Sequence, residues 1–149
     1  MKNLIFAALV VVLASSCWKN EVNPDAKCAI AGMEGANCDI ETRDKLVGLW
    51  ASNGGVTSKQ VDFYGGIGKA GPVTDIFLFD FAGYDSTMIQ ARIDGDRITF
   101  DNQQLNDTVT VSGTGIVNRR DDSLLTIEWA YTLTSNATPI AAVATWVEQ

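Results

Sequence analysis

The sequence contains no histidine. Without an imidazole the chain cannot assemble a Ser-His-Asp triad, a Cys-His dyad or a histidine-liganded metal site. An enzyme built from this chain would depend on carboxylates, lysine, tyrosine or serine alone. We therefore expect a protein that is not an enzyme and that carries no metal and no cofactor.

No apolar run in the sequence is long enough to span a membrane, and the longest one lies near the N-terminus. Met1, Lys2 and Asn3 precede an uncharged stretch at 4–13, and small residues follow at 14–16. This order of a cationic, an apolar and a small-residue segment is typical of a secretory signal peptide, here residues 1–16. The apolar stretch is much shorter than the roughly 20 residues of a membrane-spanning helix.

Cysteine is scarce, and its count of 3 is odd. Small residues directly before Cys17 resemble a bacterial lipobox, in which the cysteine becomes a lipidated N-terminus after cleavage. Ala14 occupies a position where leucine is commoner. The resemblance implies a diacylglycerol thioether on Cys17 and a stable anchor in the outer membrane, facing the periplasm or the cell surface. The alternative is an ordinary secreted protein with a stray cysteine.

The remaining cysteines, Cys28 and Cys38, form an even pair in a compartment where disulfides persist. Gly32 and Gly35 favour a turn that brings the two together. Two cysteines with no histidine cannot make a zinc site, so we expect a disulfide. The stretch GMEGANC resembles the closing loop of an EGF-like module, with Met33 in place of the aromatic residue. Residues 17–40 are thus expected to form a short stalk with an EGF-like stub.

Positive charge is in the minority, with 11 Lys and Arg against 18 Asp and Glu. An acidic protein repels polyphosphate, so nucleic acid is a poor candidate partner. The charges are scattered along the chain, which is typical of a solvated surface. The length after Cys38 suits one domain with one core.

Apolar and polar residues alternate with a period of two from Lys45 onward, which predicts strands. We expect a short turn of helix at 42–45 and no longer helix. The predicted strands are 45–52, 58–64, 74–81, 86–93, 96–100, 107–118, 123–133 and 140–148. Asp94 and Gly95 predict a tight hairpin. Such short strands favour an all-β fold, an antiparallel up-and-down barrel of eight strands at 41–149 or a sandwich, and closure leaves no exposed edge.

The tripeptide GLW at 48–50 resembles the Gly-x-Trp of the lipocalin and wider calycin group. Together with FAGYDSTMIQARIDGDRITFDNQQ and TVTVSGTGIV, it makes residues 28–149 similar to small lipocalin-like domains of bacterial lipoproteins. That resemblance implies an eight-stranded barrel in which Trp50 plugs the closed end. It implies little about chemistry, because members of the group are mostly without established ligands.

The predicted strand 74–81 is apolar on both faces, with Ile76 and Leu78 on one and three phenylalanines on the other. One interpretation is a barrel that binds a small apolar molecule. Its candidate contacts are Trp50, Phe77, Phe79, Phe81, Trp129, Tyr131 and Trp146. The alternative is a barrel filled by its own side chains, acting as a surface interaction or structural module. Inward small residues (Gly113, Gly115, Ala142 and Ala144) would favour a cavity, and inward bulky rings would favour filling.

Other motifs have plainer interpretations. GGIGKAG contains Gly66-x-Gly68-x-x-Gly71, but Pro72 follows where a dinucleotide site needs a helix, so we expect a flexible inter-strand loop. Asp80 and Glu128 are carboxylates near apolar residues, yet nothing in the sequence brings them together as an acid and base pair. Arg92 and Arg97 flank the predicted hairpin and are expected to be solvated.

Overall fold

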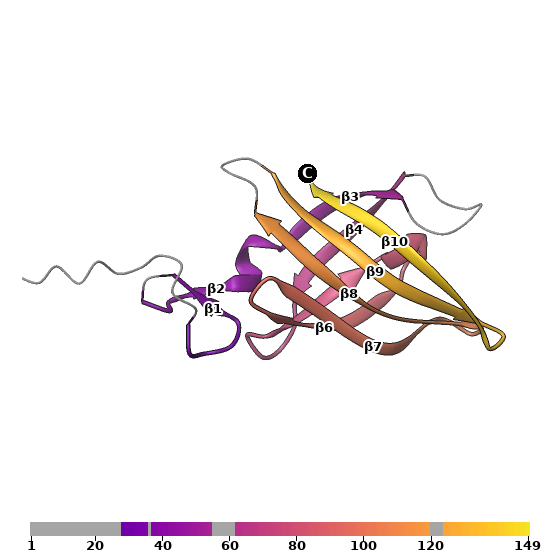
Figure 1. Ribbon diagram of the computed structural model, residues 1–149, viewed down its shortest axis with the longest axis horizontal. Coiled ribbons are helices and arrows are strands. Elements are labelled where there is room, and N and C mark those ends of the chain that lie inside the picture. Colours follow the sequence, from indigo (N-terminus) through magenta and orange to yellow (C-terminus); the bar gives the residue numbers. More distant parts are fainter. Residues whose placement is uncertain (1–27, 36, 55–61, 120–123) are drawn as a thin grey trace, which may run out of the picture.

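The barrel domain is a closed sheet of eight antiparallel strands in the order β10-β3-β4-β5-β6-β7-β8-β9 (Figure 1). We describe a computed structural model of the chain, which places residues 28–35, 37–54, 62–119 and 124–149. Each strand pairs with its neighbour in the chain, and β10 pairs with β3 to complete the ring. The all-β, eight-stranded barrel predicted from the sequence is confirmed.

The elements begin and end as follows. The stub before the barrel contains β1 (Met33–Glu34), β2 (Ile40–Glu41) and the 3-10 helix η1 (Thr42–Lys45). The barrel strands are β3 (Gly48–Gly54), β4 (Asp62–Lys69), β5 (Asp75–Phe79), β6 (Met88–Asp94), β7 (Arg97–Asn106), β8 (Val109–Arg119), β9 (Leu125–Ser135) and β10 (Thr138–Glu148). A second 3-10 turn, η2 (Phe81–Gly83), lies between β5 and β6. No helix in these described segments is long and apolar enough to cross a membrane.

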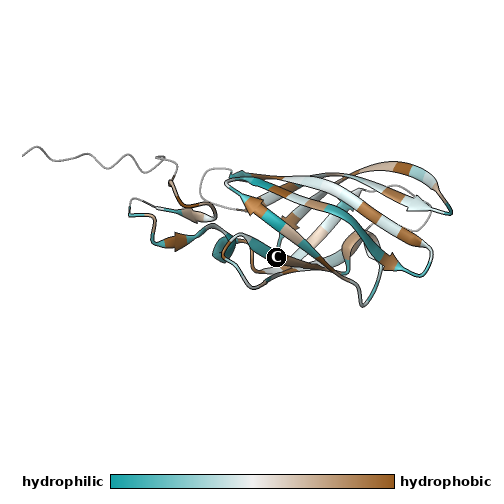
Figure 2. Ribbon diagram, turned by 90° about the horizontal axis from the view of Figure 1, so that it is seen from below, coloured by the Kyte–Doolittle hydropathy of each residue, from teal (hydrophilic) through white to brown (hydrophobic). Residues whose placement is uncertain are grey.

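Alternation along the strands explains why the sheet closes. On β6 the side chains of Ile89, Ala91 and Ile93 are buried while those between them are exposed. Figure 2 shows the same banding of apolar and polar residues along the barrel strands. Because side chains of a strand point alternately to the two faces, one face of every strand contributes to a common core.

The glycine-rich segment is mainly strand, and the expectation of a flexible loop at GGIGKAG is wrong for most of it. Gly65, Gly66 and Gly68 all lie within β4, and the connection to β5 begins only after Lys69. A Cβ added at Gly65 would lie 2.6 Å from a ring carbon of Trp146, so this glycine provides space for the indole. The glycines serve close packing in the sheet instead of loop mobility.

The predicted strand at 74–81 ends earlier than its pattern indicates. β5 stops at Phe79, and Phe81 belongs to η2, where the backbone leaves the sheet. Asp80 and Ala82 both have left-handed backbone angles, with φ of 52° and 55°. This turn breaks the alternation, so Phe81 does not share the outward face of Phe77 and Phe79.

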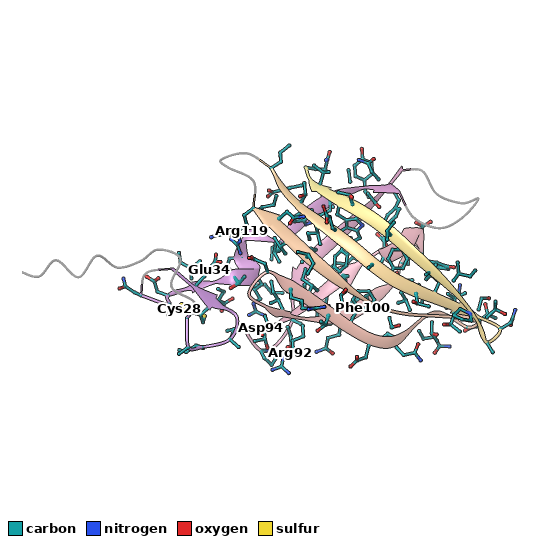
Figure 3. The ribbon with its side chains drawn as sticks, viewed as in Figure 1. Cys28, Glu34, Arg92, Asp94, Phe100 and Arg119 are labelled. Carbon is teal, nitrogen blue, oxygen red and sulfur yellow. A yellow bond between two sulfur atoms is a disulfide. The ribbon has the colours of Figure 1, made fainter. Side chains whose placement is uncertain are left out.

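The stub packs against the barrel. Cys28 and Cys38 form the predicted disulfide, with Cα atoms 5.6 Å apart. Gly32 lies so close to the β4–β5 connection that an added Cβ would be 2.9 Å from the carbonyl oxygen of Val73. Glu34 of β1 forms an ion pair of 3.0 Å with Arg119 at the end of β8, and Figure 3 shows these two side chains meeting. The described part of the stub is therefore fastened to one end of the barrel.

Arg43 of η1 is buried and holds the β4–β5 connection in place. Its Nη1 donates to the carbonyl oxygens of Ala70, Pro72 and Asp75 at 2.6, 2.7 and 2.8 Å. Its Nε donates to Glu41 at 3.0 Å. These hydrogen bonds satisfy a buried guanidinium that would otherwise be costly to desolvate.

The carboxylate of Glu41 is shared between two cations. Hydrogen bonds from Arg43 and from Lys69 hold the pKa of Glu41 below its usual value. Hydrogen bonds to Asp44 and to Glu41 raise the pKa of the Lys69 ammonium. Because Lys69 ends β4 while Glu41 directly precedes η1 and Asp44 lies within it, these ion pairs join the short helix to the sheet.

Candidate functional site

The interior of the barrel contains five of the seven residues proposed as ligand contacts. Trp50, Phe81, Trp129, Tyr131 and Trp146 are all buried. Phe77 and Phe79 are not among them, because both point to the outside of β5. The structure therefore divides the candidate set between the barrel interior and its outer wall.

Phe81 lies at the centre of an aromatic cluster, defined here as Phe81, Phe100, Trp129, Tyr131 and Trp146. Its ring centroid is 5.1 Å from those of Phe100 and Tyr131, 5.2 Å from Trp129 and 5.5 Å from Trp146. Several of the pairs are edge-to-face, the arrangement that aromatic quadrupoles prefer. The cluster is a packed core, and Figure 3 shows Phe100 within the barrel.

Small residues also face inward, but rings occupy the space beside them. Gly115 and Ala144 are buried together with the rings. A Cβ added at Gly113 would lie 2.9 Å from the ring of Phe100, and one added at Gly115 would lie 2.6 Å from Trp129. Inward small residues were expected to indicate a cavity, and here they accommodate bulky neighbours. Inward small residues and inward bulky rings were expected as alternatives, and both occur in this barrel.

Two polar atoms in the barrel interior lack a hydrogen-bond partner among the described residues. They are Nε1 of Trp129 and Oγ of Ser52, each on a residue that is 2% exposed or less. Trp50 differs, because its Nε1 donates to the carbonyl oxygen of Leu46 at 2.9 Å. Buried donors normally find a partner, so the orphaned indole N–H of Trp129 calls for an explanation.

The outer wall of β3 to β6 carries five large apolar side chains, which we call the outer apolar face. It consists of Leu49, Tyr64, Phe77, Phe79 and Met88. The register places Leu49 opposite Gly66, Gly66 opposite Phe79, and Phe79 opposite Met88, so Leu49, Phe79 and Met88 lie in one row across four strands. Tyr64 and Phe77 lie two residues from that row, on β4 and β5. The exposed fraction of Leu49 is 65% and that of Tyr64 is 68%. Contiguous exposed apolar residues of this kind often mark interaction sites.

A groove separates the stub from the end of the barrel. It measures about 710 Å³ and has both apolar and charged walls. Ile30, Met33 and Ile116 supply apolar surface, and Glu34 and Arg119 supply charge. Arg119 is already shared between Glu34 and Asp96, at 3.0 and 2.9 Å. Two further hollows, of about 510 and 500 Å³, lie along β8, β9 and β10.

The two carboxylates considered for acid and base chemistry lie on separate elements. Asp80 follows β5, and its Oδ1 accepts a hydrogen bond from the backbone N–H of Ser86 at 2.6 Å. Glu128 is exposed on the outer face of β9, a strand that does not neighbour β5. Arg92 and Arg97 are exposed, as expected, near the predicted tight hairpin, whose two turn residues are Gly95 and Asp96 because Asp94 still pairs with Arg97. No group of three His, Cys, Asp or Glu side chains in the described segments is arranged to hold a metal ion.

Comparisons of the chain with protein-family models, curated proteins and solved structures found no match. The barrel architecture and the side-chain geometry are therefore the basis for any functional proposal.

Proposed function

We propose that this protein is a membrane-anchored bacterial lipoprotein whose barrel acts through its outer surface, without catalysis. The observation that carries the proposal is the aromatic cluster. Phe81 and the four rings around it occupy the place where a barrel would hold a ligand. This reverses the order of the two hypotheses from the sequence, in which ligand binding came first.

Cys17 is the proposed lipidation site. The supporting argument is the lipobox-like sequence before it, together with the signal peptide pattern at 1–16. The segment from Cys17 to Cys28 can reach at most about 40 Å when fully extended. A lipid on Cys17 would therefore keep the stub end of the barrel near an outer-membrane surface, on its periplasmic or exterior side.

The outer apolar face is the strongest candidate for contact with a partner protein. Its five large side chains carry no charge. Gly66 and Gly68 have no side chains, and the ring of Phe79 lies against them. Interfaces are enriched in aromatic residues and methionine, which this face supplies. The net charge of −7 argues against nucleic acid as a partner.

A second candidate function is binding of a small apolar molecule inside the barrel. The specific observation in its favour is the unpaired Nε1 of Trp129 within the aromatic cluster. A molecule that displaced one ring and accepted this N–H would satisfy the donor. This hypothesis requires that the interior rearrange, whereas surface binding does not.

Native mass spectrometry separates the two candidates. The mature chain with Cys17→Ala would be produced in its own host, purified gently and sprayed under native conditions. We expect the mass of the polypeptide alone. A reproducible added mass that is lost on denaturation would instead favour binding inside the barrel.

The anchor has its own test. The unsubstituted protein should be found in the membrane fraction with the added mass of a diacylglycerol on Cys17, and Cys17→Ala should release it. Continued membrane retention of the Cys17→Ala variant would contradict the lipoprotein assignment.

A further inference from the structure

We propose that the Phe81 side chain occupies a binding site for a neutral molecule with one planar ring and one hydrogen-bond acceptor, and that such a ligand binds by displacing Phe81. The inference rests on the second candidate function and specifies its ligand class. Three features of the structure support it: Phe81 comes from a connection between strands, its neighbours have a left-handed backbone, and Nε1 of Trp129 in the same cluster has no partner among the described residues.

Phe81 differs from the rest of the aromatic cluster in its origin. Phe100, Trp129, Tyr131 and Trp146 project from strands β7, β9 and β10, whose ladders fix them. Phe81 projects from η2, in the connection between β5 and β6. A ring on a connection can leave the interior without breaking the sheet, whereas a ring on a central strand cannot.

The backbone around Phe81 is held in a conformation that residues with a Cβ disfavour. Asp80 and Ala82 have φ of 52° and 55°, and neither is glycine. The left-handed region brings Cβ close to the neighbouring carbonyl oxygen, so the inward position of Phe81 is reached at a conformational cost. Backbone strain of this kind gathers in segments that switch or bind ligands.

Hydrogen bonds make the connection a compact unit. The backbone N–H of Asp80 donates to Thr87 O at 3.1 Å, and that of Tyr84 donates to Phe81 O at 3.2 Å. The Thr87 hydroxyl donates to Tyr84 O at 2.7 Å. These bonds lie within the connection itself, so it can move as one piece about its junctions with β5 and β6.

The unpaired indole N–H defines the polar part of the ligand. Trp129 contacts Phe81 edge-to-face, with centroids 5.2 Å apart, and its buried Nε1 has no partner in the described residues. A hydrocarbon ring such as that of Phe81 offers no lone pair to this donor. A ring whose carbonyl oxygen comes within hydrogen-bond distance of Nε1 would fill the same space and would also accept the hydrogen bond.

The size and charge of the ligand follow from the same surroundings. Four rings surround the phenyl group of Phe81, so a ligand that replaces this group has room for one ring. Arg43 is the one buried charged side chain of the described segments, and its Nε and Nη1 donate to Glu41 and to backbone carbonyls. A charged ligand would have no counter-ion there, which favours a neutral molecule.

The test uses the mature chain with Cys17→Ala and two probes of matched shape, acetophenone and ethylbenzene. The first carries a carbonyl oxygen and the second does not. Binding would be followed by calorimetry and by the NMR resonance of the Trp129 indole N–H, assigned with Trp129→Phe. Ala82→Gly is the key variant, because glycine accepts a φ of 55° and so favours the inward position of Phe81, while it alters no ring of the cluster and removes only a methyl group that packs against the core. Gly71→Ala, in the exposed β4–β5 connection, is the matched control.

We expect acetophenone to bind more tightly than ethylbenzene and to shift the indole resonance. Ala82→Gly should weaken acetophenone binding by on the order of fivefold, since the ligand must then displace a more stable inward state, and Gly71→Ala should not change it. An unmoved indole resonance at saturating acetophenone would overturn the site. Equal affinity in Ala82→Gly and its parent would overturn the displacement of Phe81. Because added probes are used, these outcomes are independent of whether the host supplies a ligand.

Discussion

Gly115 on β8 packs directly against the indole of Trp129 on β9, its cross-strand partner. A Cβ at position 115 would lie 2.6 Å from Cζ3 and 2.7 Å from Cε3 of that ring. Because Trp129 is enclosed by Phe81, Phe100 and Trp146, the ring has little room to withdraw. We predict that Gly115→Ala lowers the free energy of unfolding by about 1–3 kcal/mol, the usual effect of overpacking a core.

Urea denaturation followed by tryptophan fluorescence would measure this change. The matched control is Gly71→Ala, since a Cβ at Gly71 meets no atom within 4 Å. That variant should stay within about 0.5 kcal/mol of the parent protein. A Gly115→Ala protein as stable as the control would show that the indole has space to move, contrary to the packing described above.

Strand alternation made the barrel predictable from the sequence. The alternation of apolar and polar residues in the predicted strand 123–133 places Ile127, Trp129 and Tyr131 on one face, and all three are buried. The short helical turn at 42–45 was likewise expected and is η1. These features depend on local residue patterns, which is why they can be recognised without tertiary information.

The residues of the aromatic cluster were less predictable, because Phe81 enters it only where the alternation of inward and outward side chains ends after β5. Phe77, Phe79 and Phe81 have identical spacing, yet the first two lie outside and the third lies at the centre of the core. The change of direction occurs at Asp80 and Ala82, whose left-handed backbone is unusual for residues with a Cβ. Asp80 and Gly83 stand at positions that are common in turns, but no local pattern in the sequence signals left-handed angles at two residues with a Cβ.

The glycines were misleading for a related reason. The glycine-rich sequence predicts a loop at Gly65 and Gly68, but each lies beside an aromatic ring, Trp146 for the first and Phe79 for the second. Trp146 belongs to β10, which β3 separates from β4 in the sheet, and Phe79 belongs to β5, the strand that pairs with β4. A glycine that makes room for a distant ring has the same sequence signature as one that makes a flexible loop.

The disulfide should stabilise the stub more than the barrel. Replacing Cys28 and Cys38 by serine removes a cross-link worth about 2–3 kcal/mol by loop-closure entropy. The aromatic cluster involves no stub residue, so we predict an unchanged near-ultraviolet circular dichroism spectrum together with faster proteolysis within residues 28–41. Loss of the aromatic signal in the double serine variant would show that the barrel needs the bridge in order to fold.

Arg43 should be among the most sensitive charged residues of the described segments. Arg43→Met leaves the carbonyl oxygens of Ala70, Pro72 and Asp75 without their donor, and we predict a loss of about 3 kcal/mol in the free energy of unfolding. Arg92→Met, at an exposed position on β6, is the control and should change stability by less than about 0.5 kcal/mol. Chemical denaturation of both variants checks the prediction. Equal stabilities would mean that solvent replaces the guanidinium without cost.

Stability at alkaline pH should depend on Tyr131. Burial, followed by the nearby charge of Tyr84, raises the pKa of the Tyr131 phenol above its ordinary value of 10.0. The folded protein then keeps this proton at a pH where the unfolded chain has begun to lose it. The resulting stabilisation is complete below pH 10 and is lost as the pH rises towards the folded pKa, with a slope of at most about 1.4 kcal/mol per pH unit.

Tyr131→Phe removes this titration, so its stability should fall less steeply above pH 10 than that of the parent. Tyr64→Phe, on the outer apolar face, should follow the parent curve, because the side chain of Tyr64 is exposed. Thermal unfolding midpoints measured from pH 9 to 11.5 give the comparison. Parallel curves for the parent and Tyr131→Phe would show that the phenol ionises as readily in the folded barrel as in the unfolded chain, and that water reaches this part of the aromatic cluster.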